Sequence, residues 1–244
     1  MNRILFEKDE IGPDGRVSFG GVRAEHVKRV LHGETGQTLK TGTVDGLAGT
    51  SVITAIEGDT VTVQTFHDTA MPQPWADLIL APPRPRVMKR LLPQLATLGV
   101  GRIALVGAKK TEKDFWGATL LKEENYRPLL IDGLMQGGTT AMPHLEMRRS
   151  FRKFAIDELD SMFPTEYRIV AHPYASAEKA GAEPKERRDR LLLAIGPEGG
   201  WTDDEVALLE EKGFRRYSLG PRILRTDTAA IGLLVKLNNE QGEI

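Results

Sequence analysis

The pattern of apolar and polar positions changes near residue 70. Before that point, short segments alternate apolar and polar residues between glycine-rich turns, at 16–19, 37–40, 50–56 and 60–64. A period of two, rich in threonine and valine, is typical of strands with one buried face. We therefore expect residues 1–70 to form a small antiparallel β-barrel or sandwich. One helix is expected over 24–31, because Val27, Val30 and Leu31 recur at helical spacing.

Beyond residue 75 the apolar positions form continuous runs, as in strands buried on both faces. These runs are 78–81, 103–106, 168–171 and 191–195. Helix-like stretches lie between them, at 86–98, 118–136 and 150–162. Strands that alternate with helices predict an α/β fold with a parallel sheet covered on both sides, over 76–244. The proline-rich segment 71–74 is the expected linker, and the charged stretch 178–190 is expected to be a solvated loop or helix edge.

The amino-acid composition excludes several kinds of chemistry but says little more about the fold. The 244 residues include 33 basic and 34 acidic side chains and no cysteine, which excludes disulfides, thiolate metal sites and thiol nucleophiles. Acidic residues follow Phe6 too early for a signal peptide, and no apolar run reaches membrane-spanning length. We expect a cytoplasmic protein with no membrane contact. No spacing of histidines and carboxylates indicates a metal site.

The most informative segment joins a buried strand to a helix through a glycine-rich turn. It reads Gly196-Pro197-Glu198-Gly199-Gly200 after the run 191–195, and Thr202 with Glu205 then forms a capping-box signature. Glycines allow the backbone to approach a ligand closely, whereas the alternative is a tight turn with no ligand. The turn lacks the lysine and serine or threonine of a P-loop, so a phosphate cradle is not favoured.

A second glycine-containing loop, at 219–229, follows a short expected strand at 217–219 and leads into an apolar C-terminal helix. Taken alone, Thr226 or Asp227 is a helix N-cap, and Arg222 and Arg225 are surface charges. Two such loops at the carboxyl ends of neighbouring buried strands nevertheless mark the place where open α/β sheets bind ligands.

These two motifs together resemble the signature of the RsmE-type methyltransferases of small-subunit ribosomal RNA, in the SPOUT superfamily. The resemblance covers nearly the whole chain, because that family joins a PUA-like β-barrel to a C-terminal α/β domain. It implies a deep trefoil knot, a homodimer packed through the knot domain, and S-adenosylmethionine as cofactor. It also implies methylation of nitrogen 3 of one uridine in 16S rRNA within the small ribosomal subunit.

Carried onto this sequence, the resemblance implies three cofactor loops, the first by position only. Their expected cofactor-binding residues are Ala171, His172, Ile195, Gly196, Pro197, Glu198, Gly199, Gly200, Leu219, Gly220, Ile223, Leu224, Arg225, Thr226, Thr228 and Ala229. Trp201 stands where the family commonly has an aromatic residue and is expected to wall the pocket.

The proposed reaction suggests roles for three charged residues. Uracil N3 has no free lone pair until its proton leaves, so the enzyme must favour the anion. Arg225 and Arg222 are candidates for stabilising negative charge on the uracil oxygens or for anchoring phosphate, because guanidinium groups are planar, bidentate donors. Asp227, where the family usually shows Glu, is either a general base or an N-cap, and we favour the structural role. The absence of cysteine agrees with nitrogen rather than carbon 5 methylation.

Clusters of basic residues are candidate RNA contacts, although a single cluster is usually a solvated face. The candidates are Arg3, Arg23, Lys28, Arg29, Arg84, Arg86, Lys89 and Arg90, with further lysines and arginines at 109–113 and 148–153. His67 and His144 are expected in loops. Residues 1–75 have a net charge of −3 and the remainder +2, so any RNA contact must be local rather than a matter of bulk charge.

The sequence departs from the family in two stretches, 94–100 and 135–139, which lack charged residues that the family usually has there. Both lie outside the cofactor loops. Cofactor binding is therefore expected to survive, while the RNA target or catalysis can differ. Two alternatives stay open, namely a paralogous SPOUT methyltransferase with another RNA substrate and a non-catalytic RNA-binding module that keeps the fold.

Overall fold

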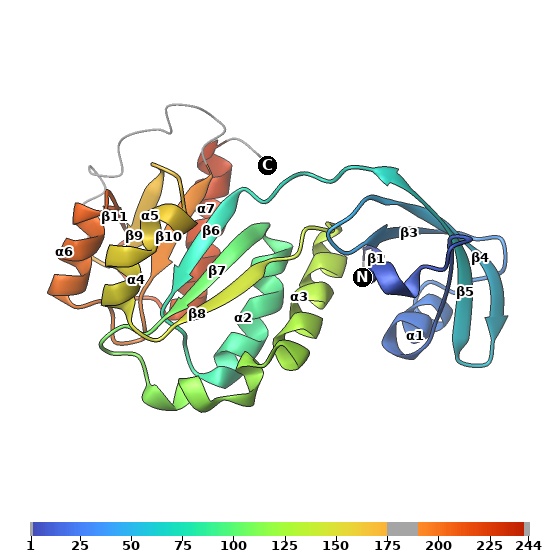
Figure 1. Cartoon of the computed structure of the whole chain (residues 1–244), viewed down its shortest axis with the longest axis horizontal. Coiled ribbons are helices and arrows are strands. Elements are labelled where there is room, and N and C mark those ends of the chain that lie inside the picture. The colour runs from blue at the N-terminus through green and yellow to red at the C-terminus, as the bar shows by residue number, and fades with distance from the viewer. Residues whose placement is uncertain (1, 175–189, 242–244) are drawn as a thin grey trace.

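The computed structural model describes residues 2–174 and 190–241 and contains two β-sheets (Figure 1). The N-terminal sheet has the strand order β1-β3-β4-β5-β2, in which only β1 and β3 pair in parallel. Its strands are β1 (Ile4–Phe6), β2 (Arg16–Phe19), β3 (Thr38–Thr43), β4 (Ala48–Glu57) and β5 (Thr60–Thr69). A short 3₁₀ helix, η1 (Lys8–Glu10), follows β1, and helix α1 (Gly21–Arg29) follows β2.

Most of this sheet agrees with the alternating pattern of the sequence. Strand β2 has the predicted bounds. Strand β4 extends the predicted segment 50–56 in both directions, and β5 extends the predicted segment 60–64 at its carboxyl end. The predicted helix begins three residues earlier than expected and ends before Val30, which is 61% exposed. The sequence missed β1, because its three residues are all buried and therefore show no alternation.

The second sheet has six parallel strands in the order β11-β9-β10-β6-β7-β8. Its strands are β6 (Ala76–Leu80), β7 (Val100–Val106), β8 (His144–Arg148), β9 (Arg168–Ala171), β10 (Leu191–Ile195) and β11 (Arg215–Tyr217). Its helices are α2 (Pro85–Thr97), α3 (Glu123–Gly137), α4 (Phe151–Asp157), α5 (Leu159–Met162), α6 (Asp203–Glu211) and α7 (Thr226–Gln241), with 3₁₀ turns η2 (Lys113–Gly117) and η3 (Thr119–Leu121). Because all strands are parallel, their carboxyl ends meet at one edge.

Helices cover both faces of this sheet, which explains the continuous apolar runs. In β10, Leu191, Leu193 and Ile195 belong to the core that contains residues of α2, α3 and α7. Leu192 and Ala194 belong to the opposite core, with residues of α4, α5 and α6. Every residue of β10 is therefore buried, and no polar position interrupts the strand. The fold class predicted for this part of the chain is confirmed by the parallel α/β sheet.

The structure differs from the prediction in elements whose residues are only partly buried. Strand β8 was not predicted, and its first residue, His144, is in a strand rather than a loop. The short strand expected at 217–219 instead spans 215–217, where two consecutive half-buried arginines precede the buried Tyr217. The helix expected over 118–136 begins only at Glu123, after two 3₁₀ turns. The charged stretch 178–190 lies outside the described residues except for Arg190.

Contacts between the two sheets involve one of the stretches that depart from the family. The backbone N–H of Asn2 donates to the carbonyl of Met135 at 2.9 Å, and Arg3 Nε donates to Gly138 O at 3.0 Å. Arg127 on α3 forms a two-pronged ion pair with Glu7, next to β1. The uncharged stretch 135–139 thus ends a helix and supplies backbone acceptors to the N-terminal sheet.

The other departing stretch, 94–100, joins α2 to β7. Gly99 has a φ of +78°, which favours glycine, and Leu98 O accepts a 2.7 Å hydrogen bond from the indole of Trp75. The residues of this stretch therefore have structural roles, in the turn and in packing. The stretch lies at the amino end of β7, opposite the edge where the carboxyl ends of the strands meet.

His67 lies in β5 rather than in a loop, and its surroundings predict a pH effect. Its ring nitrogens are 2.8 Å from Thr41 Oγ1 and 3.0 Å from Thr43 Oγ1, and its ring stacks on Phe6. Burial, and secondarily the charge of Arg3, lower the pKa of His67 below its ordinary value of 6.5. Folding then favours the neutral ring, so its stabilisation is present above pH 6.5 and is lost as the pH falls below that value.

We expect the free energy of unfolding to fall between pH 7.5 and pH 5.5, and to fall less in a His67→Gln variant, which cannot titrate there. Urea unfolding at the two pH values measures the difference. His172 also has a lowered pKa, so the variant should reduce the pH dependence without abolishing it. An unchanged pH dependence in His67→Gln would contradict this account.

Candidate functional site

A cavity of about 460 Å³ lies at the carboxyl ends of β9, β10 and β11. Three loops, one from each strand, form most of its wall, and α7 closes it through Ala229 and Leu233. The remaining lining residues are Lys110, Ala171, His172, Pro173, Tyr174, Ile195, Gly196, Pro197, Glu198, Gly199, Gly200, Trp201, Asp203, Arg216, Tyr217, Ser218, Leu219, Arg222, Ile223, Leu224 and Thr226. Parallel topology causes this convergence, since it sends all three loops to the same edge.

The loop after β10 is shaped by close backbone packing. A Cβ atom on Gly196 would lie 3.0 Å from Trp201 Cδ1 and 3.1 Å from the Trp201 backbone nitrogen. Gly200 has a φ of +71°, a conformation that side chains other than glycine rarely adopt. Trp201 is 8% exposed, and its ring packs on Phe151 at 5.0 Å between centroids. Its indole N–H is buried and has no acceptor among the described residues.

Polar contacts tie the three loops together. The hydroxyl of Thr226, 4% exposed at the start of α7, donates to Gly196 O at 3.2 Å. Ser218 Oγ, in the loop after β11, donates to Gly220 O at 2.9 Å and lies 3.3 Å from Pro173 O in the loop after β9. The walls of the cavity are therefore held in position by contacts between loops that are far apart in the sequence.

Most of the residues predicted to bind the cofactor line this cavity. Those that do are Ala171, His172, Ile195, Gly196, Pro197, Glu198, Gly199, Gly200, Leu219, Ile223, Leu224, Thr226 and Ala229. Gly220, Arg225 and Thr228 do not line it, although they belong to the same loop and helix start. Gly220 has a φ of +125°, so it shapes the loop through its backbone.

The three residues with predicted catalytic roles separate in the structure. Arg222 lines the cavity and is exposed, whereas Arg225 is exposed on the same loop outside the lining. Asp227 lies in the first turn of α7, where its carboxylate accepts the backbone N–H of Thr228 at 2.9 Å. An N-cap side chain accepts from a residue two or three positions further on, so this contact with the next residue is not an N-cap bond, and both roles considered for Asp227 stay predictions.

A neighbouring loop, after β7, also reaches the cavity, and the sequence did not indicate this. Lys110 Nζ donates to Gly199 O at 2.9 Å, and the backbone N–H of Lys109 donates to Glu205 Oε1 at 2.7 Å. The other oxygen of Glu205 accepts the N–H of Thr202, as the predicted capping box requires. Glu205 therefore caps its own helix and also holds the β7 loop. Only the capping role was visible in the sequence.

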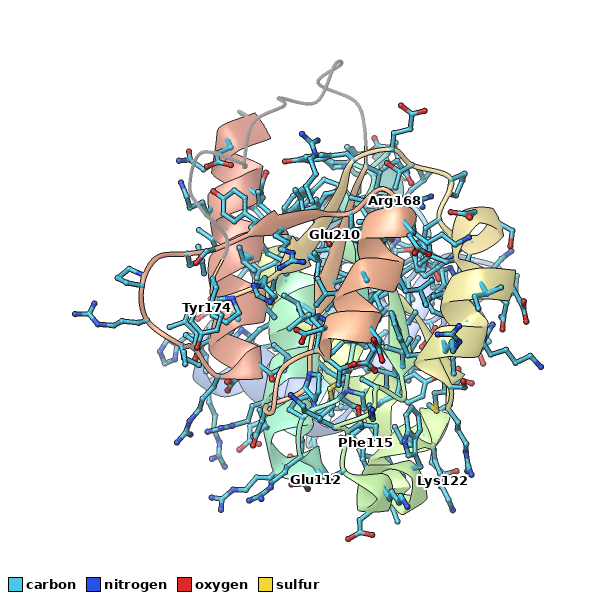
Figure 2. The ribbon with its side chains drawn as sticks, turned by 90° about the vertical axis from the view of Figure 1, so that its left-hand side faces the viewer. Glu112, Phe115, Lys122, Arg168, Tyr174 and Glu210 are labelled. Atoms are coloured by element: carbon cyan, nitrogen blue, oxygen red, sulfur yellow. The ribbon has the colours of Figure 1, made fainter. Side chains whose placement is uncertain are left out.

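His172 lies in the cavity beside Tyr174, which Figure 2 shows next to α7. Its Nδ1 accepts the backbone N–H of Tyr174 at 3.3 Å, and the two rings meet edge to face. Burial, followed by the nearby charge of Arg216, lowers the pKa of His172 below 6.5. The imidazole is therefore neutral at physiological pH and adds no positive charge to the cavity.

The basic residues predicted to contact RNA fall into two groups. On the N-terminal sheet, Arg3 donates to backbone carbonyls, and ion pairs join Arg23 to Glu10, Lys28 to Asp59 and Arg29 to Glu25. At the start of α2, by contrast, Arg84, Arg86, Lys89 and Arg90 are all exposed, and of these only Arg84 has a carboxylate partner, Glu112, among the described residues.

Two negative observations apply to the described part of the chain. No group of three or more histidines and carboxylates there is arranged to hold a metal ion. None of its helices has both the length and the apolar character needed to cross a membrane.

Comparison with known proteins identifies the family. A model described as the RNA methyltransferase domain matches residues 70–238, which include the whole cavity. The ribosomal RNA small subunit methyltransferase E of Treponema pallidum is 33% identical over 94% of this chain and 88% of its own length. The ribosomal RNA small subunit methyltransferase E 1 of Borreliella burgdorferi is 28% identical over 61% of this chain and 60% of its own length. The chain belongs to the ribosomal RNA small subunit methyltransferase E family of RNA methyltransferases.

Solved structures agree on the fold. The ribosomal RNA small subunit methyltransferase E of Neisseria gonorrhoeae, bound to S-adenosyl methionine, has a TM-score of 0.77 at 21% identity, covering 98% of this chain and 97% of that one. A Legionella pneumophila protein described as a methyltransferase, in complex with the same cofactor, has a TM-score of 0.75 at 25% identity with the same coverage. Both likenesses include the N-terminal sheet as well as the parallel α/β sheet.

Proposed function

We propose that this protein uses S-adenosylmethionine to methylate nitrogen 3 of a uridine in the RNA of the small ribosomal subunit. The observation that carries the proposal is the three-loop cavity at the carboxyl edge of the parallel sheet. Its lining contains most of the residues that the family signature assigns to the cofactor. The cofactor supplies an electrophilic methyl group on a sulfonium, and the chain's own residues bind and orient the two reactants.

The cavity suits a nucleoside joined to an amino acid. Its volume lies in the range of small-molecule pockets, and Ile195, Leu219 and Leu233 offer apolar surface for a purine ring. Gly200, where a Cβ would meet no atom within 4 Å, leaves room for close approach of the ligand to the backbone, whereas Gly196 allows the loop to pack against Trp201. The buried N–H of Trp201 lacks an acceptor among the described residues and would gain one from a polar group of the cofactor.

The chain's residues then have to favour the uracil anion. We assign to Arg222, on the cavity wall, and to Arg225, three residues further along the same loop and outside the lining, the stabilisation of negative charge that develops on the uracil oxygens. His172 stays neutral because burial lowers its pKa, so it does not repel the positively charged sulfonium. Positioning and electrostatics supply the acceleration, and no covalent nucleophile is required.

The remaining expectations belong to the same proposal. We assign residues 1–70 to a PUA-like RNA-binding domain and 76–244 to a SPOUT domain with a deep trefoil knot, whose loops include the cofactor loops at 195–200 and 219–229. The exposed apolar residues Ile223 and Val235, near the knot, support a homodimer packed through that domain. A cytoplasmic location follows from the ribosomal substrate.

Transfer of a tritiated methyl group to small ribosomal subunits from a strain that lacks its own enzyme tests the proposal. A methyl group on N3 blocks the pairing edge of uracil, so reverse transcriptase should stop at one uridine in the treated RNA. Label that appears only in tRNA or large-subunit RNA would favour a paralogous activity. Failure to bind S-adenosylmethionine in calorimetry would favour a non-catalytic RNA-binding module.

A further inference from the structure

The loops after β6, β7 and β8 bring an unpaired set of cations to the carboxyl edge of the parallel sheet, beside the cavity. We propose that this set, the edge cluster, is the main contact for the phosphate backbone of the substrate RNA. The edge cluster consists of Arg86, Lys109, Lys113, Arg149, Arg152 and Lys153. The inference rests on the proposed function, because it names the surface that holds the substrate of that reaction.

The charge of these loops is strongly one-sided. Residues 84–90, 107–114 and 149–153 contain ten basic residues against two acidic ones, Glu112 and Asp114. All six members of the edge cluster are exposed, and none of them is paired with a carboxylate within the described ranges of the chain. Glu112 is occupied by Arg84 at 3.1 Å, which leaves Asp114 as the opposing charge in these segments.

Topology makes the three loops neighbours. β6, β7 and β8 pair in sequence in the sheet, and the backbone N–H of Gly107 donates to Arg148 O, so the loops after β7 and β8 touch. Adjacent strands are about 4.8 Å apart, so the edge cluster extends over a short stretch of surface. In Figure 2, Glu112 lies at the lower end of the sheet, whereas Arg168, at the amino end of β9, lies near the top.

The β7 loop is also fixed against the cofactor loop. Lys110 Nζ binds Gly199 O, and Glu205 binds the backbone N–H of Lys109. The backbone that carries Lys109 is thus held beside the cofactor loop. Asp203 and Asp204, at the start of α6, lie on the β10 side and would repel phosphate there. The charge pattern therefore directs an RNA strand over the β6 to β8 half of the edge.

The four N-terminal cations that the sequence predicted to contact RNA differ in this respect. Arg23, Lys28 and Arg29 each have a carboxylate partner, and Arg3 is bound to carbonyl groups between the two sheets. A paired cation contributes less to the release of counterions from RNA than an unpaired one does. The N-terminal sheet can still contact RNA by shape, while the electrostatic part of the affinity comes from the edge cluster.

Two matched double variants test the proposal, each removing one arginine and one lysine. Arg149→Gln with Lys153→Gln changes the edge cluster, and Arg29→Gln with Lys28→Gln changes the N-terminal sheet. Filter binding to an in vitro transcript of the small-subunit RNA, at several salt concentrations, measures affinity. The edge variant should bind RNA about 10-fold more weakly than wild type near 0.1 M salt. Its plot of log binding constant against log salt concentration should be less steep by about 1.5. The affinity of the N-terminal variant should stay within about 2-fold of wild type.

Binding of S-adenosylmethionine, measured by calorimetry, should be unchanged in both variants and shows that each is folded. Lys109→Gln with Lys113→Gln provides a second edge variant, expected to behave like the first. Wild-type affinity in both edge variants, equal losses in the edge and N-terminal variants, or no binding by wild type would overturn the proposal. If wild type binds RNA through the edge cluster but transfers no methyl group, the proposed reaction fails and the surface assignment stands.

Discussion

Replacing Gly196 with valine should weaken S-adenosylmethionine binding by about 100-fold. Even a Cβ at this position would lie 3.0–3.1 Å from atoms of Trp201, and the additional methyl groups of valine must push against the indole or enter the cavity. Overpacking of this kind typically costs about 1–3 kcal/mol, and the upper end corresponds to about a 100-fold change in Kd. Isothermal titration with the cofactor measures the effect.

Gly117→Val is the matched control for this prediction. Gly117 lies in η2, outside the cavity, and a Cβ there would meet no atom within 4 Å. The control variant should bind the cofactor as wild type does. Thermal unfolding of both variants separates loss of the site from loss of the fold. Wild-type affinity in Gly196→Val would mean that the cofactor does not occupy the space beside Trp201.

Arg222→Ala should lower kcat for methyl transfer by on the order of 100-fold and leave cofactor affinity nearly unchanged. Arg222 lines the cavity, and loss of one preorganised donor to developing negative charge commonly costs about 10²–10³ in kcat. Arg225→Ala tests the neighbouring guanidinium, which lies outside the lining. Single-turnover transfer of labelled methyl to small-subunit RNA, with the cofactor saturating, isolates the chemical step.

Arg222→Lys separates charge from geometry, because lysine keeps the charge but not the planar pair of donors. We expect it to restore only part of the rate. Arg216→Ala is a useful comparison, since Arg216 also lines the cavity but is paired with Glu210 at 2.7 Å. Full activity in both Arg222→Ala and Arg225→Ala would remove charge stabilisation by this loop from the mechanism.

Local sequence patterns predicted an element well where all of its residues had the same degree of burial or where a capping signature marked its start. The run 191–195 became β10 with the predicted bounds, and the signature of Thr202 and Glu205 became the start of α6. The prediction of strands failed where buried, half-buried and exposed residues followed one another without a regular period. Strand β8 is half-buried after its exposed first residue, and β11 is three residues with two arginines, so neither shows a clear period.

The site was predictable to the extent that it is built from contiguous motifs. The loops after β10 and β11 were identified because glycine, proline and polar residues interrupt apolar runs there. Lys110 and Glu205 could not be assigned to the site, because their contacts join residues 89 and 96 positions apart. The same limit applies to the basic residues, since charge is visible in the sequence but ion pairing is not.

The sequence by itself determined most of the strands and helices, the two glycine loops and the family to which their combination belongs, because these depend on local backbone preferences and on periodic burial. Tertiary structure alone decided which loops share one cavity and which cations remain unpaired. Lys28 and Lys153 look alike in the sequence, yet Asp59, 31 positions away along the chain, pairs with the first, while the second is exposed and has no carboxylate partner among the described residues. That difference depends on distances in space, which strand pairing and packing set and which spacing along the chain does not.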